Sequence, residues 1–467
     1  MKRITFACLM IAAAALFLAG GTARAQYPED ALRLSFPGMT LGARFLGMGN
    51  AAIGLADDYT ATFWNPAGLA QLRRMEISGS VDHLSLSNDA TFFGNNTNYS
   101  NSSTSFNNLG FVYPFPTVRG SLVIALGYNR TNNFTSALSF EGFNPVSSII
   151  PTLYNSSYDL DMAYQLYLED STGYTPLTKD VKQKGKVLED GGLSQWALSG
   201  SVEAAKGLAL GLTLNLVSGS YTYTRNYTET DSRQIYRTFP WDFRELDLAN
   251  TVSSDISGIG ATFGLLYQWQ EMLRVGLTLK TPTYYYVKEN FKSDGSSYFK
   301  TGNPSSYSYS IPGTGEYDVV SPFVFGGGAS FTMVGLTVSG SAEYTDYTEM
   351  QFKNAPTSVM SENTTIKEIY RATTNLHVGA EYVIPGIGLR LRGGFMLRPS
   401  PYKGDPSSYD QKIVTAGLGF LIQDQLMLDL GYAHGTWNTY QVNYDATSRT
   451  DQSIATNNII AGISYRF

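Results

Sequence analysis

Residues 208–217 read LALGLTLNLV, and this stretch shows the pattern that governs most of the chain. Leucine occupies every second position, and alanine, glycine, threonine, asparagine and valine fill the positions between. Successive side chains of a β-strand point to opposite faces, so the pattern predicts a strand with one apolar face and one small or polar face. The same alternation recurs in residues 273–280 and 376–382.

The composition indicates which kind of β protein these strands build. Charged residues make up 15% of the chain, against roughly 25% in ordinary soluble domains. Aromatic residues reach 13%, with 32 Tyr and 25 Phe. A soluble β-sandwich would give the same alternation, but its water-facing side would normally carry more charge. No apolar run after residue 25 approaches the ~18 residues of a membrane-spanning helix. The sequence therefore predicts an all-β transmembrane barrel with a lumen of small and polar residues.

Fourteen alternating runs are expected to form an antiparallel barrel, and an even number lets both chain ends lie on one side. Six connections are tight turns, and the other seven are longer and polar, notably residues 87–107 and 141–192. This asymmetry is typical of short periplasmic turns and long extracellular loops. Many runs exceed the ~9–11 residues that cross a bilayer, so we expect the barrel to project above the outer surface. The runs are 75–86, 108–116, 121–140, 193–204, 208–228, 247–269, 273–290, 314–332, 336–352, 366–384, 389–400, 408–422, 426–442 and 452–467.

The first 25 residues have the features of a secretory signal peptide. Lys2 and Arg3 precede a short apolar run, and Ala23 and Ala25 form the A-x-A pattern of a cleavage site. The only cysteine, Cys8, lies in this segment, so we expect the exported chain to have neither a disulfide nor a thiol nucleophile. The net charge of −6 becomes more negative without the signal, which argues against nucleic-acid binding.

The last residues, NNIIAGISYRF, place apolar side chains at alternate positions and end on the aromatic Phe467. We interpret Phe467 as the assembly signal that the bacterial barrel-assembly machinery recognises. Together with the signal peptide and the alternating hairpins, it predicts that the protein resides in the outer membrane of a Gram-negative cell. We therefore expect outer-membrane lipid to surround the barrel.

Residues 26–74 precede the first predicted strand and differ from the rest of the chain. Small residues recur through LGARFLGMGNAAIGLADDYTATFWNPAGLAQL at 41–72, where they permit close packing. Extensions that stay unpacked are usually polar and charged, whereas this segment is apolar enough to need burial. The lumen of the barrel is the enclosed surface against which it can be buried. We therefore expect residues 26–74 to form a plug, or hatch, inside a barrel of residues 75–467.

The chain resembles the FadL/TodX family of outer-membrane transporters for long-chain fatty acids and other hydrophobic compounds. The resemblance rests on GARFLGMGNA and ADDYTATFWNPAGLA in the front segment, on VGLTLKTPTYY and LRLRGGFMLRPSP farther along, and on the terminal phenylalanine. It implies a fourteen-stranded barrel whose N-terminal hatch carries the motif Asn65, Pro66 and Ala67. It also implies a substrate route through a lateral gap at an inward kink in the third strand, which strand order places near Gly127.

Basic residues on the predicted lumen faces are the candidate partners of a ligand carboxylate. Pairing with the lumen acids Glu343, Glu381 and Asp429, which would brace the wall, is the alternative that we favour. The basic residues are Arg274, Lys280, Arg390, Arg392 and Arg398.

Three other patterns have simpler explanations than the sites they resemble. GMGNAA at 47–52 fits a dinucleotide-binding fingerprint, but no hydrophobic strand precedes it. The segment 159–170 could offer carboxylates to calcium, although a short amphipathic helix that caps the pocket is favoured. The histidines His83, His377 and His434 lie far apart in the sequence, and we interpret them as wall residues. No G-x-S-x-G serine motif occurs either, so we predict no enzymatic activity, no cofactor and no metal.

The sequence thus predicts a passive outer-membrane channel for hydrophobic small molecules, either long-chain fatty acids or aromatic hydrocarbons. A barrel of the same build that serves as a protein-docking or shuttle subunit of a secretion system is the alternative. An outer-membrane hydrolase is a third reading, which the missing nucleophile motifs oppose.

Overall fold

The computed structural model describes residues 28–38, 40–270, 272–302 and 304–467. The predicted signal peptide, residues 1–25, lies outside these ranges. In the described ranges, none of the helices is both long and apolar enough to cross a membrane.

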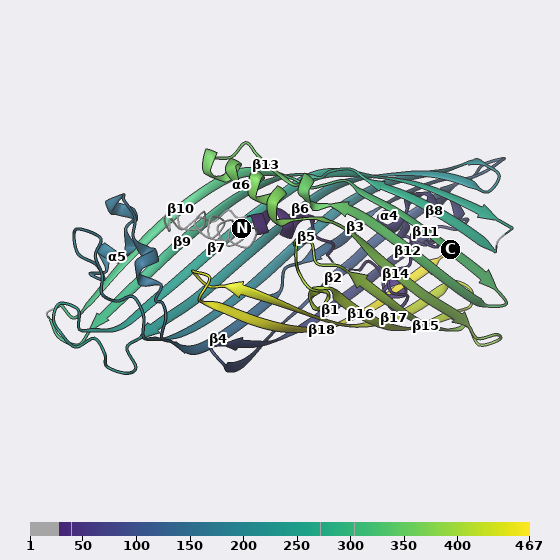
Figure 1. Ribbon diagram of the computed structural model, residues 1–467. Helices are drawn as coiled ribbons and strands as arrows, with labels where there is room; N and C mark the ends of the chain where they lie inside the picture. The colour runs from purple at the N-terminus through teal and green to yellow at the C-terminus, as the bar shows by residue number, and fades with distance from the viewer. Residues whose placement is uncertain (1–27, 39, 271, 303) are drawn as a thin grey trace, which may run out of the picture.

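The strands form one closed antiparallel barrel of fourteen staves (Figure 1). We call a stave either one strand or two strands that follow each other along the same line of the wall. The barrel closes because β1 pairs with β18, from Glu76 opposite Arg466 to Thr91 opposite Asp451. Single strands form ten staves: β1 (Glu76–Phe92), β2 (Asn95–Phe115), β5 (Val181–Ala205), β6 (Leu208–Thr230), β7 (Phe243–Trp269), β14 (Ala372–Val383), β15 (Leu389–Arg398), β16 (Gln411–Ile422), β17 (Leu426–Val442) and β18 (Arg449–Arg466). Pairs of strands form the other four: β3 (Leu122–Asn133) with β4 (Ser136–Asn144), β8 (Leu273–Lys280) with β9 (Tyr284–Phe299), β10 (Ser306–Val320) with β11 (Val324–Met333), and β12 (Leu336–Asp346) with β13 (Gln351–Lys353).

The fourteen predicted runs lie on these fourteen staves, so the predicted fold class is confirmed. The prediction of a polar loop at 87–107 is wrong, because β1 and β2 continue through it as a paired hairpin as far as Phe92 opposite Asn95. Serine, threonine and asparagine are frequent on both strands there. A strand with polar residues on both faces lacks the apolar alternation by which a strand is recognised in a sequence. The predicted loop 141–192 is likewise shorter, since its ends belong to β4 and β5.

The two faces of the wall differ as the alternation predicts. Along β6, Leu210, Leu212, Leu214 and Leu216 are exposed on the outside, whereas Thr213 and its inward neighbours are buried. Large apolar side chains occupy equivalent outward positions on the other staves, for example on β3, β11, β14, β16 and β18. An outward apolar band of this kind faces lipid in a transmembrane barrel.

The barrel is taller on one side, where β5, β6, β7, β9 and β10 run beyond their neighbours toward α5 (Figure 1). The connection between β4 and β5 packs at this end of the barrel. It contains η3 (Ile150–Leu153), η4 (Tyr158–Leu160) and α5 (Met162–Gln165), which is shorter than the helix predicted over 159–170. Helix α5 ends early because Tyr167 takes a positive φ of 56°. Apolar side chains of this connection pack with inward residues of β4, β7 and β9 and so cap the lumen.

Helix α6 (Thr357–Ile369) lies beside β13 (Figure 1), which pairs with β10 on one edge and, within the described residues, with no strand on the other. Its Asn363 amide accepts a hydrogen bond from the Phe352 N–H at 2.7 Å and donates one to the Phe352 carbonyl at 3.0 Å. The Asn363 side chain therefore makes the two backbone bonds that a neighbouring strand would otherwise make. The predicted run 366–384 begins in α6 rather than in β14.

Candidate functional site in the barrel lumen

The candidate site begins with residues 40–72, which lie inside the barrel toward the end that carries the C-terminus (Figure 1). We call residues 40–72 the hatch segment. It contains α3 (Ala43–Gly47), α4 (Ala61–Trp64) and η2 (Pro66–Gln71), and most of its side chains are buried. Its own apolar side chains pack with inward residues of β2 and β3, so it shares a core with the wall.

Asn65 joins three separate parts of the structure. Its amide nitrogen donates to the carbonyl of Ile53 at 2.8 Å and to that of Leu265 on β7 at 3.1 Å. Its side-chain oxygen accepts from the N–H of Ala67 at 3.2 Å, which caps η2. Pro66 stands at the first position of that helix, where a missing N–H is tolerated. The Asn-Pro-Ala motif thus fixes the hatch segment to itself and to the wall.

Glycines on the lumen face let the hatch segment approach the wall backbone. A Cβ atom at Gly211 would lie 2.3 Å from the nitrogen of Ala67, and one at Gly264 would lie 2.2 Å from the Asn65 side-chain oxygen. The hatch glycine Gly49, with a φ of 59°, packs equally closely on the carbonyl of Val378. The glycines of GMGNAA therefore serve packing between hatch and wall.

A buried ionic network holds the hatch segment in place. The Arg44 guanidinium contacts the carboxylate of Asp57 at 2.5 Å within the hatch and that of Glu381 on β14 at 3.3 Å. Asp57 also binds Arg274 on β8 at 3.1 Å. Burial raises the pKa of Asp57, but the Arg44 and Arg274 guanidiniums outweigh it and hold this pKa well below its usual range. Asp57 therefore stays ionised in any physiological medium and ties the hatch to the wall.

The five predicted basic residues all face the lumen side and have partners in the protein. Lys280 pairs with Glu343 at 2.9 Å, and Arg390 approaches Glu381 at 3.6 Å. Arg392 contacts both Glu381 at 2.7 Å and Asp429 at 2.6 Å. The pairs with Glu381 join the neighbouring strands β14 and β15. The Lys280–Glu343 and Arg392–Asp429 pairs each reach across one intervening strand, β11 and β16 respectively. Arg274 pairs with the hatch residue Asp57, and Arg398 donates to the Gly38 carbonyl at 3.3 Å.

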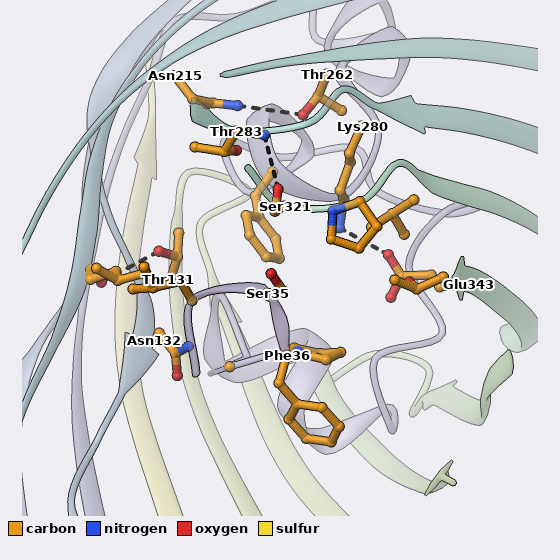
Figure 2. Close-up of a pocket in the computed structure, with 18 of the residues that line it drawn as sticks. Ser35, Phe36, Thr131, Asn132, Asn215, Thr262, Lys280, Thr283, Ser321 and Glu343 are labelled. Atoms are coloured by element: carbon orange, nitrogen blue, oxygen red, sulfur yellow. Dashed lines mark hydrogen bonds and ion pairs between the residues drawn. The ribbon is translucent and has the colours of Figure 1, made fainter. Parts of the chain in front are cut away.

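A cavity of about 170 Å³ lies above the hatch segment, in the middle of the lumen (Figure 2). Its lining includes Phe63 and Trp64 of the hatch segment and residues 34–38, at the end of helix α2 (Pro28–Ser35). The wall contributes both apolar and polar groups, including the Lys280–Glu343 pair drawn in Figure 2. The cavity is therefore amphipathic rather than wholly apolar.

The histidines have different surroundings. His377 lies in the cavity wall, where its Nδ1 is 3.2 Å from the Gly49 carbonyl and its Nε2 is 3.6 Å from Glu343. His83 and His434 lie on outward positions of β1 and β17 and contact Thr104 and Asn457. The structure therefore does not bring the three together.

The third stave is irregular, but at a different place from the one predicted. Gly127 lies in regular pairing, opposite Gly110 of β2 and Ala197 of β5. The pairing of β3 with β5 shifts register between Arg130 and Asn132, and the stave breaks between Asn133 and Ser136. The resemblance and strand order placed a kink near Gly127, but the glycine makes room for the hatch side chain of Tyr59.

Backbone pairing between β2 and the third stave ends at this irregularity. Asn108 opposite Asn129 is the last pair, and no ladder joins β2 to β3 or β4 beyond it within the described ranges. Side chains bridge the two staves there: Asn133 donates to the Ser103 hydroxyl at 2.7 Å, and Thr97 donates to the carbonyl of Ser139. We call this stretch without backbone pairing the β2–β3 gap.

Three residues outside the predicted site position the hatch segment. Arg44 centres the ionic network, and Asn107, the extra residue of a bulge in β2, donates to the Thr40 carbonyl at 2.7 Å and accepts from the Gly42 N–H at 2.8 Å. Tyr59 donates from its hydroxyl to Asn129 at 2.9 Å. Arg44 and Tyr59 both stand in the stretches on which the resemblance rests, whereas an asparagine in a polar strand offers no such signal.

The closed antiparallel wall and its outward apolar band define a class, the transmembrane β-barrels. The family model described as outer membrane protein transport protein (OMPP1/FadL/TodX) matches residues 192–467. The chain therefore belongs to this family of outer-membrane transporters for hydrophobic compounds. A search of curated proteins found no match.

Solved structures of the same fold cover nearly the whole chain. A FadL homologue of Pseudomonas aeruginosa is 13% identical, with a TM-score of 0.59 over 93% of this chain and 99% of that one. The toluene transporter TodX of Pseudomonas putida is 14% identical, with a TM-score of 0.57 over 92% and 99%. The toluene transporter TbuX of Ralstonia pickettii is 18% identical, with a TM-score of 0.51 over 93% and 100%.

Proposed function

We propose that this protein admits hydrophobic small molecules, either long-chain fatty acids or aromatic hydrocarbons, and releases them sideways through the β2–β3 gap. The observation that carries the proposal is the end of backbone pairing at Asn108 and Asn129, directly beside a lumen that the hatch segment fills. The ligand would pass the amphipathic cavity above the hatch and leave through the wall.

The proposal agrees with the chemistry of the cargo. A hydrophobic molecule gains about 0.8 kcal/mol for each methylene group that leaves water. A straight path through the barrel would return it to water on the other side, whereas a sideways exit leads into hydrocarbon. The ionic contacts of Arg44, Asp57 and Glu381 favour a hatch that stays in the barrel during transport.

The named substrates of two structural relatives support the ligand class. TodX and TbuX are described as toluene transporters. The sequence distance to both leaves the choice between fatty acids and aromatic hydrocarbons to experiment. Identification by mass spectrometry of lipids that co-purify with the protein tests this choice directly.

A disulfide across the gap tests the sideways exit. The variant Ser103→Cys/Asn133→Cys replaces two side chains that are joined by a hydrogen bond of 2.7 Å. With the gap bridged by oxidation, we expect uptake of a hydrophobic substrate to fall several-fold and to recover on reduction. Cys8 is the only native cysteine, so the engineered pair has no competitor outside the predicted signal peptide.

The matched control is Ser87→Cys/Ser100→Cys, which joins opposite residues of β1 and β2 where backbone pairing is already continuous. Its oxidation should leave uptake unchanged. Equal uptake by the oxidised and reduced gap variant would show that substrates do not leave by this route.

A further inference from the structure

Tyr59 of the hatch segment lies against the wall just below the β2–β3 gap. Its side chain is fully buried, and its backbone N–H donates to the Glu76 carboxylate at 2.7 Å. The ring therefore has a fixed position at the junction of β2 and β3.

Two facing glycines form the recess that receives this ring. Gly110 on β2 and Gly127 on β3 lie opposite each other in the ladder, and both face inward. A Cβ atom at Gly110 would lie 2.0 Å from a ring carbon of Tyr59, and one at Gly127 would lie 2.2 Å from its hydroxyl oxygen. Any other residue at either position would displace the ring or the strand.

The Tyr59 hydroxyl reaches the point where pairing ends. It donates to Asn129 at 2.9 Å, and Asn129, itself fully buried, belongs to the last β2–β3 pair. The bulged residue Asn107 binds the hatch backbone from the other strand at the same level. The hatch thus holds both strands at the lower edge of the gap.

A second contact holds the upper part of β3. The Asn132 amide donates to the Arg33 carbonyl at 3.1 Å, and a Cβ atom at Gly38 would lie 2.2 Å from the Thr131 carbonyl oxygen. The irregular part of β3 is therefore tied to the N-terminal segment at both ends, whereas its contact with β2 is a side-chain bond from Asn133 to Ser103.

We propose that Tyr59 is a positioning residue for the lateral exit: by binding Asn129 in the recess of Gly110 and Gly127, it keeps β3 from pairing with β2 above that point. Without this contact, β3 relaxes toward β2 and the gap narrows. The inference rests on the proposed sideways exit, and it assigns control of that exit to the hatch.

The test removes only the hydroxyl, with Tyr59→Phe, and in a second variant fills the recess, with Gly127→Ala. Uptake of a hydrophobic substrate should fall roughly three- to ten-fold, the range expected for loss of one hydrogen bond. Heat-resistant migration in mild detergent should persist, because the strand ladder does not depend on Tyr59. If Gly127→Ala fails to assemble, Tyr59→Phe decides the matter alone.

The two control variants make the same chemical changes at residues on the outer face of the wall. Tyr128→Phe removes a hydroxyl from the next residue of β3, which bonds to Ser194 instead, and Gly200→Ala adds a methyl group where nothing lies within 4 Å. Both should transport like the wild type.

The disulfide pair Ser103→Cys/Asn133→Cys separates this inference from the proposed function. In the Tyr59→Phe background its oxidation should become several-fold faster, because the gap is narrower. Unchanged uptake and unchanged oxidation in Tyr59→Phe would overturn the positioning role, even where the disulfide itself blocks transport. If the disulfide has no effect on uptake in either background, the sideways exit itself is wrong.

Discussion

At the scale of the single residue, Asn65 shows what a buried amide does in this lumen. It is 1% exposed, and its side chain binds Ile53, Ala67 and Leu265 at once. Both ends of the amide are thus used for bonds within the protein. Asn65 therefore holds the hatch segment and has no free group to offer to a ligand.

We predict that Asn65→Ala leaves an inserted, heat-resistant barrel but changes hydrophobic uptake several-fold or makes the pore leaky. Two buried carbonyls lose their donor, at a cost of about 1–3 kcal/mol, whereas strand pairing in the wall is self-contained. Pro66→Ala should act in the same direction, because it loosens the start of η2. Uptake assays and heat-modified gel migration measure the two effects.

Asn98→Ala is the control for these variants, since Asn98 binds Ser87 and Asp89 on the exposed side of the β1–β2 hairpin. If Asn65→Ala does not assemble, the motif is a folding element. If it assembles and transports like the wild type, the hatch has no role in ligand handling.

At the scale of the element, β18 closes the barrel and ends in a clamp with the first stave. The Phe467 N–H donates to the Met75 carbonyl at 3.0 Å, and the Met75 N–H donates to the Phe467 carbonyl at 3.1 Å. Arg466 binds Glu76 beside them at 2.7 Å. The last residue of the chain thus takes part in the seam on which closure depends.

Deletion of Phe467 should sharply reduce the amount of heat-resistant protein in the outer membrane. The deletion removes both backbone bonds to Met75 and the aromatic ring that stacks on Tyr465. Phe467→Tyr keeps the bonds and the ring and should assemble normally. Membrane fractionation with heat-modified migration gives the answer, and normal assembly of the deletion variant would contradict the role of this residue.

At the scale of the whole molecule, one network of charges joins the hatch segment to distant staves. Arg44 and Asp57 lie on the hatch, Arg274 on β8, Glu381 on β14 and Arg392 on β15. Removal of one member leaves a buried charge without its partner, which is costly in a low-dielectric lumen. The position of the hatch segment therefore depends on ion pairs with two separate parts of the wall, β8 and β14.

We predict that liposomes containing the wild-type protein do not swell in sugars or amino acids, and that Arg44→Met makes them swell. The substitution removes the guanidinium that Asp57, Asp58 and Glu381 share, so the hatch segment is held less firmly. Arg73→Met is the matched control, because Arg73 is exposed and makes only long contacts, with Glu203 at 3.5 Å and with the Gly120 carbonyl at 3.4 Å. Rapid swelling with the wild-type protein would instead identify a general porin.

The barrel, its fourteen staves and its apolar band could all be predicted from the sequence. These features follow from side chains that alternate along a strand, as in residues 208–217, and they need no knowledge of which strands are neighbours. The Asn-Pro-Ala motif and the five lumen cations were also visible in the sequence. The full length of the β1–β2 hairpin was not visible in the sequence, because a strand with polar residues on both faces looks like a loop.

Only the tertiary structure decided which groups meet inside the barrel. The contact of Tyr59 with Asn129 joins residues 70 positions apart, and that of Arg44 with Glu381 joins residues 337 positions apart. Alternation places a residue on the inner face, but the partner it meets there depends on the stagger of the strands and on the path of the hatch. The same reason explains why the third stave is irregular at residues 130–135 and not at Gly127. Gly127 lacks a side chain because the Tyr59 ring packs against it, and its strand pairs regularly there.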